Sequence, residues 1–241
     1  MPPPPNASPK LIAHRGGPKY APENTMAAFR NALSIGVDGF EFDVQMTMDG
    51  EPVILHDETV DRTTNGRGAV RELTLAEIRA LDAGRGEPVP TFQEALDLAK
   101  SAGVWMLAEL KSPSLYPGIE AKVLKALEAA NYLERTLIMS FDWKSLAKVR
   151  ALSAAANIGA LYDEKMLTVS AVPAGAQYAC PLAYLALLNP FMTGQAHRQG
   201  RQVFTWFWGY ESPWLYLALR ALGVDGIIAD DPIVVKRTLG R

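Results

Sequence analysis

Eight short apolar segments follow one another along the chain, and longer segments with a helical pattern separate them. A continuous apolar run of this length is typical of a strand buried on both faces, as in a parallel sheet. Eight strand–helix units predict an α/β protein with a closed (β/α)8 TIM barrel, and an open doubly wound sheet is the alternative. The predicted strands cover residues 11–14, 39–44, 104–110, 136–140, 157–161, 177–182, 202–206 and 226–229.

The predicted barrel occupies residues 10–241 as a single domain, and the Pro-rich leader 1–9 is expected to be disordered. Helices are expected at 24–35, 91–102, 119–130, 143–155 and 213–222 among others. About 60 residues separate the second strand from the third, far more than the usual 2–6 of such connections. We therefore expect a small insertion after the second strand, at about 46–90.

Composition excludes several classes of partner. The formal net charge is −2 with no run of like charges, so neither nucleic acid nor an anionic membrane surface is an expected partner. The most apolar run, residues 178–188, is too short for stable membrane insertion. The single cysteine, Cys180, excludes an internal disulfide framework and fits a reducing compartment, so a cytoplasmic location is expected. The oligomeric state stays open.

The second predicted strand contains "FEFDV", in which two carboxylates alternate with apolar residues. Side chains alternate faces along a strand, so Glu41 and Asp43 project together from one face. An ordinary half-exposed strand would give the same alternation. In a barrel, however, the face opposite the helices points inward, and the carboxyl ends of the strands line the mouth where active sites form.

Two other strand ends carry charge. His14 and Arg15 end the first strand in "LIAHRGG", and Glu109 and Lys111 end the third in "LAELK". Glu109 and Lys111 lie two residues apart, so both should point into the same mouth. Unpaired burial would cost several kcal/mol for each group, so these groups must neutralise one another or hold an ion.

Glu41, Asp43 and Glu109 together offer hard oxygen ligands, which suit one divalent cation, Mg²⁺ or Ca²⁺. With such an ion the three acids leave one negative charge, and Arg15 and Lys111 bring the site to one positive charge. A monoanionic ligand such as a phosphodiester would neutralise it. An internal ion pair between Glu109 and Lys111 without a metal is the alternative.

The insertion begins with a hairpin signal, Asp49-Gly50, in "MDGEPVILHD". A two-residue turn there would place Met48 opposite Glu51 and Asp43 opposite His56, delivering an imidazole beside the carboxylates. His14 and His56 could then supply the acid and the base that phosphodiester hydrolysis requires. His197, in "GQAHRQG", is expected on a helix surface.

The motifs "AHRGG", "PENTMAAF", "DGFEFDVQMTMDGEPVILHD", "DRTTNGRG", "VPTFQEAL", "LAELK" and "GVDGIIADDP" closely resemble the glycerophosphodiester phosphodiesterase family over nearly all the chain after the leader. The resemblance implies hydrolysis of glycerophosphodiesters to glycerol 3-phosphate and an alcohol, in a (β/α)8 barrel with a divalent ion. It assigns His14 and His56 as the acid/base pair, Glu41, Asp43 and Glu109 as metal ligands, and Arg15 and Lys111 as phosphate contacts.

Trp206 matches the tryptophan of a family motif near the seventh predicted strand, where an aromatic face can pack on the substrate. The motif usually continues to an asparagine, and this chain has Gly209 instead, in "WFWG". Pro22 to Thr25 match the family's "PENT", but Asn24 or Thr25 also fits a helix N-cap.

Two other functions compete with hydrolysis of small soluble diesters. A lysophospholipase D-like or sphingomyelinase-like enzyme would use the same groups on a lipid, and Trp206, Trp208 and Trp214 could contact an acyl chain or simply fill the core. A catalytically silent barrel that binds phosphate is the third hypothesis.

Overall fold

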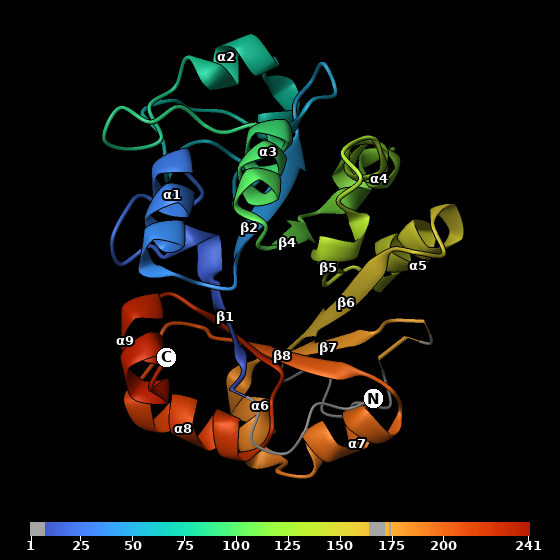
Figure 1. Ribbon diagram of the computed structural model, residues 1–241. Helices are drawn as coiled ribbons and strands as arrows, with labels where there is room; N and C mark the ends of the chain where they lie inside the picture. The colour runs from blue at the N-terminus through green and yellow to red at the C-terminus, as the bar shows by residue number, and fades with distance from the viewer. Residues whose placement is uncertain (1–7, 164–171, 174) are drawn as a thin grey trace.

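Eight parallel strands close into a barrel in the computed structural model, which describes residues 8–163, 172, 173 and 175–241 (Figure 1). The ring closes because β1 (Lys10–Ala13) pairs with both β2 (Gly39–Met46) and β9 (Gly226–Ala229). The predicted (β/α)8 barrel is therefore confirmed, and the open sheet is excluded. The other barrel strands are β4 (Trp105–Leu110), β5 (Thr136–Ser140), β6 (Asn157–Tyr162), β7 (Tyr178–Pro181) and β8 (Gln202–Trp206).

Helices surround the strands, with α1 and α3 to α5 around one half of the sheet and α6 to α9 around the other in the view of Figure 1, while α2 lies apart in the insertion. Their ends follow local signals: the Thr91 side chain and Glu94 form a capping box at the start of α3, and Gly103 ends it in the left-handed conformation. Their bounds are α1 (Met26–Ile35), α2 (Leu75–Arg79), α3 (Phe92–Ala102), α4 (Ile119–Ala129), α5 (Trp143–Leu152), α6 (Ala183–Leu188), α7 (Met192–Arg198), α8 (Pro213–Ala221) and α9 (Pro232–Leu239).

The core has two parts, one on each face of the sheet, and the side chains of β2 point alternately to one and the other. Phe40, Phe42 and Val44 face outward into the large cluster between strands and helices. A smaller cluster fills the barrel interior and includes Leu107 and Cys180. Glu41 and Asp43 point to this inner side, above the apolar layer, so the polar face of "FEFDV" is buried rather than half exposed.

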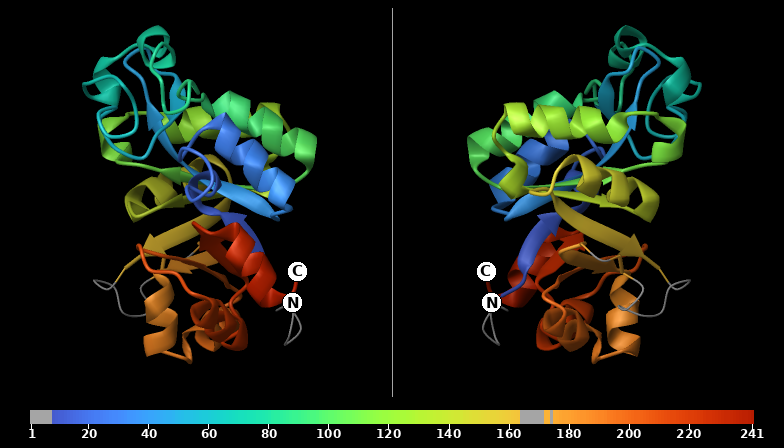
Figure 2. Two further views of the ribbon diagram at one scale, coloured as in Figure 1. Left: turned by 90° about the vertical axis from the view of Figure 1, so that its left-hand side faces the viewer. Right: turned by 90° about the vertical axis from the view of Figure 1, so that its right-hand side faces the viewer.

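The insertion after β2 has its own small core of seven buried side chains, including Val53, Val70 and Ile78. It contains β3 (Pro52–Ile54), antiparallel to β2, the short 3₁₀ helix Val70–Glu72 and α2. Figure 2 shows it in teal at the end of the molecule opposite the red C-terminal helices. Three of its residues, His56, Asp57 and Arg62, line the pocket at the mouth of the barrel.

The predicted hairpin register is wrong by one residue. Val44 pairs with Ile54, and the Leu55 amide donates to the Asp43 carbonyl, so Leu55 rather than His56 lies opposite Asp43. The turn has three residues, 48–50, between Thr47 and Glu51, and Gly50 takes the left-handed conformation that such a turn needs (φ 81°).

Most of the predicted leader, residues 1–7, lies outside the described residues. Pro9 is buried, and its carbonyl accepts a hydrogen bond from Arg241. The apolar run 178–188 divides between β7 and α6. Among the described helices, none has the length and apolar character required to cross a bilayer.

Candidate active site

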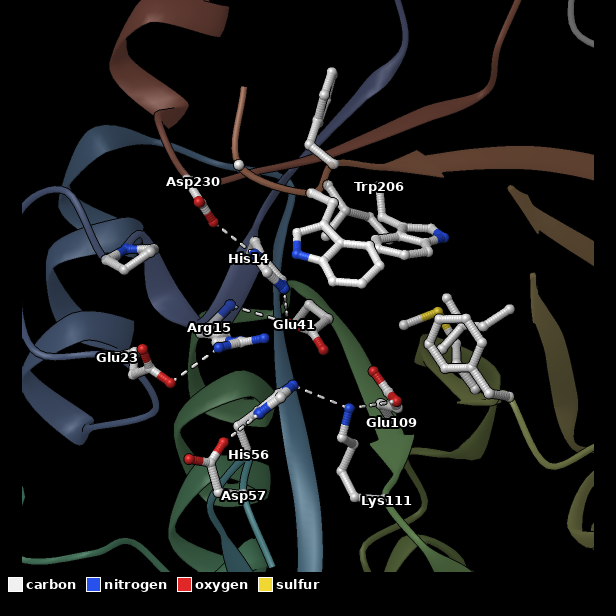
Figure 3. A pocket seen from close by; sticks show the side chains of 18 of the residues that line it. His14, Arg15, Glu23, Glu41, His56, Asp57, Glu109, Lys111, Trp206 and Asp230 are labelled. Carbon is white, nitrogen blue, oxygen red and sulfur yellow. Dashed lines mark hydrogen bonds and ion pairs between the residues drawn. The ribbon is translucent and has the colours of Figure 1, made fainter. Parts of the chain in front are cut away.

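A pocket of about 710 Å³ opens at the carboxyl ends of the barrel strands. All but one of the predicted site residues line it, and the remaining one, Asp43, is buried beneath its floor. Figure 3 shows carboxylates, histidines and cationic groups gathered on one side of the pocket, with Trp206 across from them. The prediction that three strand ends converge at one mouth is thus met by the geometry.

A cluster of three buried carboxylates lies at the floor, where Glu41 and Glu109 line the pocket and Asp43 adjoins them beneath it. Glu41, Asp43 and Glu109 each offer an oxygen, and the three oxygens lie within 4.8 Å of one another. Burial and the charge of Asp43 raise the pKa of Glu41 to about 8, and burial likewise raises the pKa of Glu109. Burial also acts on Asp43, but Lys111 and Arg15 outweigh it and lower its pKa. The nearby cations therefore keep Asp43 ionised, whereas Glu41 and Glu109 ionise less readily than exposed carboxyl groups.

A divalent cation fits this cluster. Asp43 Oδ1 is buried and has no hydrogen-bond partner among the described residues, although a buried carboxylate oxygen without a partner is costly. A hard cation would use this oxygen and keep all three acids ionised. Glu41, Asp43 and Glu109 are therefore the residues that could hold Mg²⁺ or Ca²⁺.

Two cations flank the carboxylates. Lys111 Nζ lies 3.0 Å from Glu109 Oε1 and 3.7 Å from Asp43 Oδ1. Arg15 Nε lies 3.3 Å from Asp43 Oδ2, and the Arg15 amide donates to Glu41 Oε2. Arg15 has φ 48°, in the left-handed region, so its backbone turns sharply where β1 ends. This turn lets one residue contact the cluster with both its amide and its side chain.

His14 lies at the end of β1 and is held by a carboxylate that follows β9. Its Nδ1 is 2.5 Å from Asp230 Oδ1, and its Nε2 is 3.9 Å from Glu41 Oε2. Burial lowers the pKa of His14, but the hydrogen bond to Asp230 and the charge of Glu41 outweigh it and raise the pKa to about 9. The geometry therefore favours a protonated ring.

The pKa of His56 is shifted in the opposite direction. Burial and the neighbouring cations, Lys111 and Arg15, outweigh the charge of Asp43 and lower its pKa. Its Nε2 lies 3.1 Å from Lys111 Nζ, which can only donate, and its Nδ1 lies 2.6 Å from Asp57 Oδ1 (Figure 3). These contacts favour a neutral ring whose proton is on Nδ1.

The buried side-chain amide of Gln45 holds the backbone around His56 in place. Gln45, on β2, donates from Nε2 to the carbonyls of His56 and Asp57. Gln45 in turn accepts a hydrogen bond from the Tyr116 hydroxyl. His56 thus reaches the pocket even though the predicted strand register is wrong.

Residues 22–25 carry three separate contacts. Glu23 accepts from Arg15 Nη1 at 3.0 Å. Asn24, with φ 57°, donates to Asp43 Oδ2 at 2.8 Å, whereas Thr25 is the N-cap of α1 and accepts from the Ala28 amide. Of the two capping candidates, Thr25 is confirmed, and Asn24 supports the carboxylate cluster instead.

The far wall of the pocket is aromatic. Trp206, at the end of β8, donates from Nε1 to the Cys180 carbonyl and packs edge-to-face on Phe141, with ring centroids 5.4 Å apart. Trp208 also lines the pocket and is 71% exposed. Gly209, which replaces the family asparagine, lies beside them on the lining. His197 is in α7 and pairs with Asp225 at 2.8 Å, outside the pocket lining.

Sequence reasoning missed four side chains that hold the site together: Glu23, Asp57, Arg62 and Asp230. Each one stands inside a motif that the sequence displays, in "PENT", "LHD", "DRTTNGRG" and "ADDP". Asp230 lies 216 residues from its partner His14, and Glu23 lies 39 residues from Arg62, so no local pattern could join these pairs.

Barrel enzymes place their catalytic groups at this end of the strands. Here, two histidines, two cationic side chains and a cluster of buried carboxylates meet in one pocket. The protein thus falls in the class of barrel enzymes whose sites suit anionic ligands.

A family model described as "Glycerophosphoryl diester phosphodiesterase family" matches residues 14–234. The chain belongs to this family of enzymes. It is 40% identical over 231 residues to a glycerophosphodiester phosphodiesterase of Caldanaerobacter subterraneus subsp. tengcongensis, covering 92% of this chain and 94% of that relative.

Solved structures are similar over the whole fold. A putative glycerophosphoryl diester phosphodiesterase from Silicibacter pomeroyi superposes with a TM-score of 0.85 at 29% identity, covering 97% of this chain and 93% of the other. An Oleispira antarctica phosphodiesterase, solved in complex with the product sn-glycerol-3-phosphate, has a TM-score of 0.83 at 26% identity, covering 97% of each chain.

Proposed function

We propose that this chain hydrolyses glycerophosphodiesters to glycerol 3-phosphate and an alcohol. The observation that carries the proposal is the buried cluster of Glu41, Asp43 and Glu109 with a carboxylate-held histidine on each side. Family membership and the product complex of the Oleispira antarctica relative support the same substrate class. The proposed substrate is a small molecule.

The two histidines divide the proton transfers. His56, neutral and protonated on Nδ1, accepts a proton from the attacking hydroxyl group at Nε2. His14, charged, donates its Nε2 proton to the oxygen of the departing alcohol. If water attacks, one P–O bond forms as another breaks and one water is consumed. If the substrate's own hydroxyl attacks, water must then open the cyclic diester, which gives the same net reaction. Asp230 and Asp57 hold the rings and set which nitrogen carries a proton in each.

Arg15 and Lys111 bind the phosphate oxygens and stabilise the charge that develops on them. Trp206 contacts the substrate across the pocket. Glu41, Asp43 and Glu109 would hold one divalent cation, Mg²⁺ or Ca²⁺, which would polarise the phosphoryl group when bound. Together these groups meet the three needs of diester hydrolysis, which are a base, an acid and charge stabilisation.

Turnover of glycerophosphocholine, measured as release of glycerol 3-phosphate, tests the proposal. Chelation should abolish turnover, and Mg²⁺ or Ca²⁺ should restore it. Absence of turnover with either ion over a range of pH would contradict the proposal and favour a silent phosphate-binding barrel.

One observation favours a second candidate function, a lysophospholipase D-like or sphingomyelinase-like activity. Phe141, Trp206 and Trp208 make an apolar wall on the side of the pocket away from the acids. An acyl chain could lie on such a wall. Higher kcat/KM for lysophosphatidylcholine than for glycerophosphocholine would select this candidate.

A further inference from the structure

One arginine of the insertion, Arg62, holds two pocket carboxylates at once. Its Nε and Nη2 donate to the two oxygens of Asp57 at 2.7 and 3.0 Å. Its Nη2 and Nη1 donate to the two oxygens of Glu23 at 2.8 and 3.0 Å. Both contacts are bidentate, the geometry that makes guanidinium–carboxylate pairs directional.

Each of these carboxylates also holds a residue of the proposed catalytic machinery. Glu23 Oε1 accepts from Arg15 Nη1 at 3.0 Å, and Asp57 Oδ1 lies 2.6 Å from His56 Nδ1. A continuous path therefore runs from Arg15 through Glu23, Arg62 and Asp57 to His56. Arg15 follows β1 and His56 follows β3, so the path links two separate parts of the chain.

We propose that Arg62 is a positioning residue. By holding Glu23 and Asp57, it fixes the positions of Arg15 and His56 relative to each other. This inference rests on the proposed function, because it assigns Arg15 to the phosphate and His56 to proton transfer. The contacts of Arg62 argue against a direct role in binding substrate. Three of its nitrogens already donate to carboxylates, which leaves its fork little capacity for a phosphate.

Stability alone does not account for this arrangement. The Arg62 side chain is 48% exposed, and ion pairs at exposed sites contribute little to folding. Without Arg62, Glu23 and Asp57 would be two like charges at the pocket rim. The guanidinium lowers the pKa of Asp57 to about 2, chiefly through its hydrogen bonds, so this carboxylate stays charged opposite His56.

Three single variants test the inference. Arg62→Met removes both the charge and the planar guanidinium group. Arg62→Lys keeps only the charge, because one ammonium cannot form bidentate contacts with two carboxylates. Arg67→Met is the matched control. Arg67 belongs to the same insertion and pairs only loosely with Asp61, at 3.6 Å, with an 89% exposed side chain away from the pocket lining.

The measurements are kcat and KM for glycerophosphocholine, and Tm. Arg62→Met should lower kcat about 10–100-fold, the usual cost of losing a group that orients catalytic residues, with KM within about threefold. Its Tm should stay within about 3 °C of wild type, since the lost ion pairs are exposed. Arg62→Lys should recover only part of kcat, and Arg67→Met should match wild type.

A double variant tests the route. If Arg62 acts through Asp57, the kcat of Arg62→Met/Asp57→Asn should be close to that of Asp57→Asn alone, because the path is already cut. Multiplicative losses would overturn the inference.

Unchanged kcat in Arg62→Met would also overturn it, as would a raised KM with unchanged kcat, which means direct substrate contact. A kcat loss explained by a large fall in Tm would reduce Arg62 to a folding role. An inactive wild type would instead contradict the proposed function itself.

Discussion

Replacing Asp230 by asparagine should make activity far more sensitive to alkaline pH. Asp230 holds His14 through a 2.5 Å contact to Nδ1, and asparagine keeps the shape and an acceptor oxygen but loses the charge. In the proposed mechanism His14 must be protonated, so activity is lost as pH rises through its pKa. The hydrogen bond to Asp230 is the strongest influence that raises this pKa against burial.

The size of the effect follows from the two pKa values. With a pKa of about 9, His14 is about 90% protonated at pH 8; at its ordinary value of 6.5, it would be only about 3% protonated. If asparagine returned the pKa of His14 to 6.5, kcat at pH 8 would fall roughly 30-fold, and kcat at pH 6 less than about twofold. A cation beside Glu41 would lower the pKa of His14 in both proteins. The quantity predicted is therefore the difference in pH between the alkaline limbs of the two activity profiles.

The assay is kcat for glycerophosphocholine between pH 5.5 and 10 at saturating cation. Asp231→Asn is the matched control, because Asp231 caps α9 by accepting from the Val234 amide, a role that asparagine fills equally well. The control should keep the wild-type pH profile. Coincident alkaline limbs in Asp230→Asn and wild type would refute the assignment of His14 as the charged acid.

Three further predictions concern the same pocket. His56→Ala should lower kcat by about 10²–10⁴-fold with Tm within a few degrees, and wild-type turnover would end its assignment as the base. Wild-type activity should fall on the acid side below pH 6.5, since the pKa of His56 is lowered and its neutral form is the active one; an acid limb well above pH 6.5 would contradict this. Glu41→Gln should weaken binding of Mg²⁺ or Ca²⁺ in calorimetric titrations while the fold persists, and unchanged cation affinity would remove Glu41 from the cation site.

The strand ends could be predicted because their signal is local. The two-residue alternation of "FEFDV" sets the faces of Glu41 and Asp43, and the same spacing places Glu109 beside Lys111. Asp43 and Glu109 are register partners in neighbouring parallel strands, so the carboxylates meet once the barrel closes. Barrel closure itself follows from the number of strand–helix units.

The hairpin register could not be predicted from its turn signal alone. Asp49-Gly50 fits a two-residue turn, but Thr47 closes a three-residue one, with its hydroxyl accepting from the Glu51 amide. The position of His56 depends instead on Gln45, whose side chain reaches across the hairpin. That contact becomes visible only in three dimensions.

The carboxylates that orient the histidines were also beyond local reasoning. Asp57 adjoins His56, but nothing in sequence distinguishes a ring contact from a solvated charge. Asp230 meets His14 because β9 is the barrel neighbour of β1, which sets residues 216 positions apart at one rim. Knowing the barrel order would have suggested this pair.

Crystals grown with Mn²⁺, examined for anomalous scattering, test the cation site most directly, since Mn²⁺ accepts the same oxygen ligands. The account predicts one peak at about 2.0–2.6 Å from oxygens of Glu41, Asp43 and Glu109, with none there in Asp43→Asn crystals. No peak between these carboxylates at saturating Mn²⁺, or a peak that persists in the variant, would contradict it.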